Sequence, residues 1–180
     1  MSIVVDITEI SAMVAAAGVI VGVALTFLEL RHLREQRQTD LVNRLYSAFI
    51  GKEFLDASMK FLALEFKDYE DYVNKYGPIF HVDKNRVTMN DNPELRGLLY
   101  IDNFFNQVGI LLHRGLIDVG LVRDVFTYRV EMLWKKTEPI IQGMRKEFNQ
   151  PEAGKWFEYL YNEMKKREQS FSKQVSARAS

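Results

Sequence analysis

The chain has 180 residues, and its 24 lysines and arginines balance its 24 aspartates and glutamates. Without net charge it has no long-range field to attract nucleic acid, so nucleic-acid binding is disfavoured. Cysteine is absent, which excludes disulfides, thiolate metal sites and cysteine nucleophiles.

The first predicted element is a membrane-spanning helix over residues 10–30, preceded by a short extracytoplasmic segment at residues 1–9. Residues 10–28 contain no charge and no proline. At ~1.5 Å per residue such a helix matches the roughly 30 Å hydrocarbon core of a bilayer. A buried helix of a soluble protein usually has a shorter apolar run, and a cleaved signal peptide begins with basic residues. The sequence therefore predicts one uncleaved membrane crossing.

Basic residues follow this apolar segment but do not precede it. Arg31, Arg34 and Arg37 come directly after the segment, and no lysine or arginine comes before them. Flanking basic residues usually stay in the cytoplasm. We therefore expect a protein of the inner cell membrane with its N-terminus outside and its C-terminal domain in the cytoplasm. The three arginines are also expected to contact anionic membrane lipids.

Small residues line one face of the predicted membrane helix. Ser11, Ala15, Gly18 and Gly22 share that face, and the two glycines form a GxxxG motif. Small side chains let two membrane helices approach closely. Glycine and alanine are common in membrane helices, so the motif alone is a weak signal. The hypothesis that follows is a homo-oligomer, or packing on another membrane protein, through this face.

After the membrane helix, the sequence predicts an all-α helical bundle over residues 31–170 and a flexible tail at residues 171–180. Neither glycine nor proline occurs from residue 23 to residue 50, so the membrane helix is expected to continue into the cytosolic bundle until a break at Gly51. Apolar residues recur at helical spacing in several later segments. A predicted loop over residues 77–92 interrupts these helices and is the longest in the chain.

Capping residues place several helix ends. Pro93 is predicted to start a helix that ends before Gly115, because proline suits the first helical position and glycine suits the residue just past the end. Asp118 is predicted to cap the next helix. Thr137 with Pro139 is predicted to open a further helix, and Pro151 the last one.

Evidence for catalysis or metal binding is weak throughout the sequence. There is no GxSxG elbow, phosphate-binding glycine loop or dinucleotide fingerprint. His81 and Asp83 could supply two metal ligands, but a site needs three or four and such a pair is more often solvated. Acid pairs such as Glu65 and Asp68 could act as paired carboxylates, but they are more simply part of an exposed helix face. No catalytic residue, metal or cofactor is therefore expected.

Aromatic residues are abundant and recur at helical spacing. Core packing is the leading interpretation of this pattern, and a ligand-binding cavity is the alternative. The residues concerned are Phe49, Phe54, Phe61, Phe66, Phe104, Phe105, Phe126, Trp134, Trp156 and Phe157.

Three stretches follow the single N-terminal membrane helix in a distinctive order: RQTDLVNRLYSAFIGKEFLDA, YIDNFFNQVGILLHRGLIDVGLVRDVF and WKKTEPIIQGMRKE. In this pattern the chain resembles the prokaryotic domain of unknown function 4760 family over roughly residues 10–150. The most distinctive piece is Asn103-Phe104-Phe105, followed by Gly109 and by RGLID at residues 114–118. The resemblance implies a membrane-linked helical domain and assigns no activity or functional residue.

These observations favour a non-enzymatic, single-pass membrane protein that self-associates and scaffolds or attaches to a partner through its helical domain. The alternative is a membrane-tethered sensor or effector, in which the loop over residues 77–92 and the aromatic helical core bind a small molecule.

Overall fold

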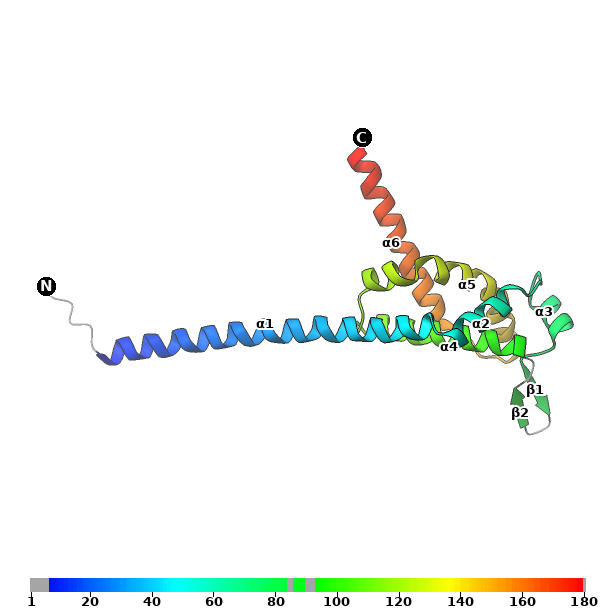
Figure 1. Ribbon diagram of the computed structural model, residues 1–180, viewed down its shortest axis with the longest axis horizontal. Coiled ribbons are helices and arrows are strands. Elements are labelled where there is room, and N and C mark those ends of the chain that lie inside the picture. The colour runs from blue at the N-terminus through cyan, green and yellow to red at the C-terminus, as the bar shows by residue number, and fades with distance from the viewer. Residues whose placement is uncertain (1–6, 84–85, 90–92, 180) are drawn as a thin grey trace. The chain divides into compact units, whose positions relative to one another are not determined.

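The computed structural model describes residues 7–83, 86–89 and 93–179, and the side chains of residues 11, 13–80, 96–126 and 128–169. Within these ranges the chain is almost entirely helical (Figure 1). The helices are α1 (Ile7–Phe49), α2 (Lys52–Leu62), α3 (Tyr69–Tyr76), α4 (Pro93–His113), α5 (Val119–Glu147) and α6 (Lys155–Ala179). The predicted all-α fold class, with one long apolar N-terminal helix, is confirmed.

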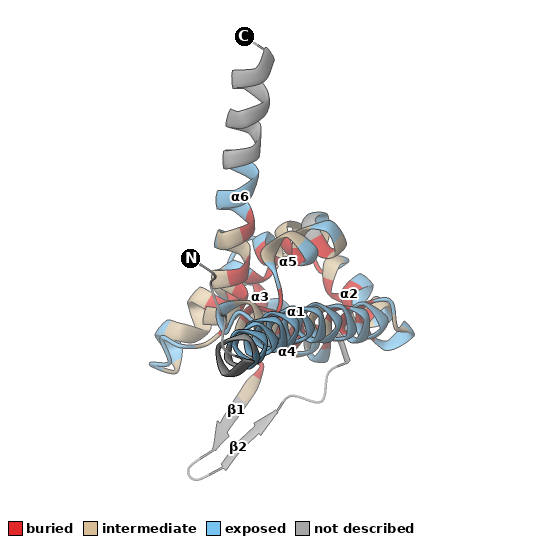
Figure 2. Cartoon of the chain, turned by 90° about the vertical axis from the view of Figure 1, so that its left-hand side faces the viewer, coloured by how far each residue is buried: buried red, intermediate tan, exposed pale blue. Residues whose placement is uncertain are grey.

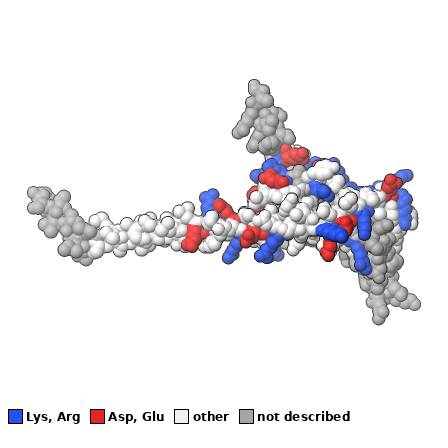
Figure 3. Space-filling model, in the orientation of Figure 1, with Lys and Arg blue, Asp and Glu red and all other residues white. Residues whose placement is uncertain are grey.

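The chain forms two compact units, Met1–Leu41 and Val42–Ser180. The first contains most of α1, where every described side chain from residue 13 to residue 37 is exposed (Figure 2). Val19, Ile20 and Phe27 are 66%, 70% and 71% exposed. Among the described residues one helix, over Met13–Phe49, is by length and composition able to cross a membrane. Its apolar part carries no charged side chain and is white in Figure 3.

The second unit is built around a cluster of aromatic rings. Phe49, at the end of α1, has its ring centroid 5.0 Å from those of Phe54 and Phe126. The rings of Phe105 and Phe157 stack at 4.6 Å and join α4 to α6. Core packing of the aromatic residues is thereby confirmed for Phe49, Phe54, Phe61, Phe104, Phe105, Phe126, Trp134 and Phe157, all of which are buried.

Local signals set several helix ends as predicted. Asp118 accepts a 2.7 Å hydrogen bond from the backbone N–H of Gly120 and caps α5. Gly115 follows α4 with a φ of +64°, a left-handed conformation that favours glycine. Gly51 separates α1 from α2. These three predictions are confirmed where neighbouring residues decide the geometry. The helix start predicted at Pro151 is wrong, because α6 begins at Lys155.

A predicted helix boundary at Thr137 and Pro139 is wrong, because α5 passes through both residues. Proline lacks the N–H that would bond to the carbonyl four residues earlier, which usually weakens a helix interior. Here Ile140 and Ile141 are buried just beyond it. The Thr137 hydroxyl is also satisfied within the helix, since it donates to the carbonyls of Leu133 and Trp134. Tertiary packing therefore outweighs the local signal.

The predicted loop over residues 77–92 contains a short hairpin, so this part of the prediction is wrong. Strand β1 (Phe80–Asp83) pairs antiparallel with β2 (Arg86–Met89), with Phe80 opposite Met89. Strands of four residues are too short to show a clear alternating pattern. The ring of Phe80 lies 6.0 Å from that of Phe148, at the end of α5. The last helix, α6, extends over residues 171–179, where a flexible tail was predicted.

Replacement of Gly109 by alanine tests the packing of α4 against α6. A Cβ atom at Gly109 would overlap the backbone oxygen of Trp156, so the two helices would have to separate. We expect a loss of about 2–3 kcal/mol of stability despite the better helix propensity of alanine, seen as a fall in melting temperature. Gln107→Ala, at an exposed position of the same helix, should change stability by less than about 0.5 kcal/mol. Equal melting temperatures for the two variants would contradict this packing.

Candidate functional site

The small-residue face of α1 is open to solvent in the structure. Ser11, Ala15, Gly18 and Gly22 are all exposed. A Cβ atom at Gly18 or Gly22 would meet nothing within 4 Å. The glycines therefore do not accommodate a neighbouring part of this chain, and a second helix could approach their backbone.

Two polar side chains in and after the apolar segment of α1 bond to groups one helical turn away in the same helix. The Thr26 hydroxyl donates to the Gly22 carbonyl at 2.8 Å, so its hydrogen-bonding need is met within the helix. Arg31 forms a 3.3 Å ion pair with Glu35, one helical turn later. Arg34 and Arg37 are exposed, and neither has an ion-pair partner among the described side chains. Both are therefore available to external anions.

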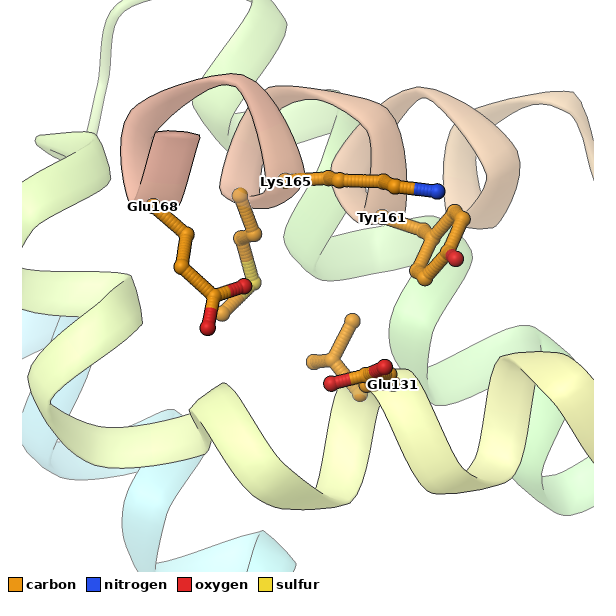
Figure 4. A pocket seen from close by; sticks show the side chains of 6 residues that line it. Glu131, Tyr161, Lys165 and Glu168 are labelled. Atoms are coloured by element: carbon orange, nitrogen blue, oxygen red, sulfur yellow. The ribbon is translucent and has the colours of Figure 1, made fainter. Parts of the chain in front are cut away.

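A small surface pocket lies between α5 and α6, with a volume of about 60 Å³. In Figure 4, Glu131 rises from α5, and Tyr161, Lys165 and Glu168 surround the pocket from α6. The Lys135 ammonium lies 2.6 Å from the Glu131 carboxylate, and Lys165 lies 5.6 Å from the centre of the Tyr161 ring. Small-molecule sites usually have volumes of roughly 300–1,000 Å³. The pocket is therefore suited to a few water molecules.

No group of three or more potential metal-ligating side chains comes together in the described part of the chain. The side chains of His81 and Asp83, the predicted candidates, lie outside the described residues. His113 packs against the ring of Trp156 at 4.6 Å. His32 forms a 3.1 Å hydrogen bond with Gln36. Both described histidines thus contact other side chains of their own unit.

A polar junction that the sequence did not predict joins α4 to the start of α6. The side-chain oxygen of Asn106 accepts hydrogen bonds of 3.1 Å from the backbone N–H groups of Trp156 and Phe157. Asn106 therefore satisfies two of the N–H groups that the first turn of α6 leaves free. On the other side of this turn, Arg145 donates to the Ala153 carbonyl and to Glu158, both at 2.8 Å.

Asp102 is the most perturbed carboxyl group in this junction. Its Oδ1 atom is buried without a hydrogen-bond partner in the described part of the chain. Burial raises the pKa of Asp102 to about 6, whereas a hydrogen bond from Asn106 and the charge of Arg145 act in the opposite direction. The sequence did contain one sign that Asp102 is buried. Asp102 lies four residues after Leu98 and three before Phe105, which places it on the same, apolar side of α4 as these two buried residues.

The raised pKa of Asp102 predicts how the Asp102→Asn substitution changes the stability of the protein at different pH values. The folded protein binds this proton more tightly than an unfolded chain, whose aspartates titrate near ~3.9. The site therefore contributes most stability below about pH 4, and this contribution is lost as the pH rises through about 6. At pH 7 we expect the asparagine variant to be more stable than the wild type by up to about 2 kcal/mol, and the gain should vanish near pH 4.

Melting curves of both proteins between pH 4 and pH 8 measure this difference. Asp56→Asn removes an exposed carboxyl group of α2 and serves as the control without the predicted trend. A wild type that exceeds Asp102→Asn in stability at pH 7 would contradict the assignment.

Comparisons with curated proteins and with solved structures find no match to this chain. A family model described as a domain of unknown function, DUF4760, matches residues 12–164. This range contains most of α1, all of α2 to α5 and the start of α6. The match confirms the resemblance drawn from the three stretches, and the chain belongs to the DUF4760 family.

Proposed function

We propose that this protein is a non-enzymatic, single-pass membrane protein that self-associates through α1 and attaches a partner through its helical unit. The observation that supports this proposal most directly is that every described side chain in the apolar segment of α1 is exposed. Water disfavours so large an apolar surface, whereas the bilayer core is a matching solvent. The segment therefore serves as an anchor.

Self-association follows from the small face of that anchor. Lipid tails are as apolar as leucine, so helices in a bilayer gain little from hiding apolar surface and associate through close packing. Gly18 and Gly22 offer open backbone on one face, with Ser11 and Ala15 in line with them. A second copy of the chain presents the same face and can pack on it symmetrically.

Orientation follows from the charges next to the anchor. Arg34 and Arg37 have no acidic partner among the described side chains, so they can bind the anionic lipids of the cytoplasmic leaflet, at about 1 kcal/mol each. Together with Arg31 they keep the second unit in the cytoplasm.

Replacement of Gly18 and Gly22 by leucine tests the proposed contact between anchors. Two leucines would hold the backbones apart, so we expect the detergent-purified oligomer to dissociate to monomers, as measured by light scattering corrected for bound detergent. Ala16→Leu with Ala24→Leu adds bulk at two small residues on the opposite side of the helix and should leave the oligomer intact. Unchanged mass for the glycine variant would exclude this face as the contact.

The absence of cysteine allows an independent test of the same face in native membranes. Ser11→Cys lies on the small face, and Met13→Cys lies on the other side of α1. Mild oxidation should join the Ser11→Cys chains into a disulfide-linked dimer and leave the Met13→Cys chains monomeric. Equal cross-linking of both variants would indicate random collision.

Orientation is testable in the same way. In intact cells, a membrane-impermeant maleimide should label Ser2→Cys and should label Ser180→Cys only after lysis. The reverse pattern would place the helical unit outside the cytoplasm.

A further inference from the structure

A surface groove in the second unit is lined by several exposed apolar side chains. Residues from the end of α1, from α2 and from α5 line it, and its volume is about 570 Å³. Tyr46, Ile50 and Tyr128 on its walls are 44%, 49% and 73% exposed. The other exposed large apolar side chains of this unit, namely Met59, Tyr100, Leu116 and Leu121, are not among its lining residues.

The floor of the groove is firmly packed. Phe49 and Phe126 line it and are 6% and 1% exposed. Their rings meet edge to face at 5.0 Å. Because both rings belong to the central aromatic cluster, the floor is preformed, and a partner that fills the groove would not have to order it first.

Among the described side chains of the groove, one cation lacks a counter-ion. The Arg129 guanidinium lies 5.9 Å from the centre of the Phe49 ring, and no carboxylate of a described side chain pairs with it. Arg123, which also lines the groove, pairs with Asp124 at 2.9 Å. One positive charge therefore remains in a setting of tyrosine and aliphatic side chains.

From this combination we infer that the groove docks an amphipathic, acidic helix of a partner protein. Tyrosine and arginine are the side chains most enriched at the energetic centres of protein interfaces. Helical walls without an exposed strand edge suit a helix that lays apolar residues at i, i+3, i+4 and i+7 into the groove. A carboxylate on this helix would pair with Arg129. Nucleic acid would need several free cations, whereas Arg129 alone lacks a carboxylate partner among the described side chains of the groove.

The inference rests on the proposed role of the helical unit in attaching a partner, and it does not depend on self-association. The probe is a phage-displayed library of random 16-residue peptides, selected on the full-length protein in lipid nanodiscs. Peptides retained by the Tyr128→Ala variant are discarded. We expect enriched sequences with helical apolar spacing and at least one aspartate or glutamate.

Charge exchange then tests the role of Arg129. For a selected peptide, replacing its acidic residue by lysine should weaken binding about tenfold, and Arg129→Glu should reverse that preference. Arg129→Gln should bind both peptides alike, and Met59→Ala, on an exposed part of α2, should behave as wild type. The preference between the acidic and the lysine peptide reverses only if residue 129 contacts the exchanged peptide residue. General damage to the fold would weaken the binding of both peptides and cannot produce this reversal.

Several outcomes would overturn the inference. They are no enrichment over the Tyr128→Ala variant, enriched peptides without acidic residues, or a peptide preference that Arg129→Glu leaves unchanged. A photo-reactive residue at position 128 that cross-links a second copy of the chain would also overturn it, since the groove would then be an interface between copies. The mass of the oligomer is measured separately, so failure of the docking groove and failure of the anchor contact are distinguishable.

Discussion

The ring of Phe49 is the aromatic contact through which the end of α1 joins the rest of the helical unit. Its centroid lies 5.0 Å from Phe54 of α2, 5.9 Å from Phe104 of α4 and 5.0 Å from Phe126 of α5. Each such pair adds about 0.5–1.5 kcal/mol to the burial of the rings themselves. One side chain thus joins the last turn of α1 to three other helices. Together with Phe126 it also forms the floor of the exposed groove.

Burial divides α1 into two chemically different parts. In the second unit, Val42, Leu45 and Phe49 recur at helical spacing and are buried, as in a helix that packs on a protein core. Before residue 38 every described side chain from residue 13 onward is exposed, although many are apolar. A protein core explains the first pattern, and the proposed bilayer environment accounts for the second. A single unbroken helix can serve both because neither glycine nor proline interrupts it after residue 22.

The sequence predicted those features that neighbouring residues determine. The apolar length of α1, the cap at Asp118 and the left-handed Gly115 all depend on a few adjacent positions. Predictions from the sequence were wrong where contacts between residues far apart in the chain determine the structure. Burial beyond Pro139 keeps α5 continuous, and backbone pairing forms a hairpin from strands of four residues. Asp102 and the groove were missed for the same reason, since each requires knowing which helices pack together.

The two uncovered surfaces differ in the physics of recognition, and this difference separates their roles. In the proposed bilayer environment, apolar side chains would not distinguish a partner from lipid, so the small face of α1 would select only by close backbone approach. In water, covering the exposed side chains of Tyr46, Ile50 and Tyr128 with a partner lowers the free energy of the system. In the proposed docking, their apolar contacts would supply affinity. Arg129, which pairs with no carboxylate among the described side chains, would favour acidic partners over basic ones. The proposed anchor would recognise shape and the proposed docking groove would recognise charge. The two surfaces would therefore engage their partners independently, as the proposed attachment role requires.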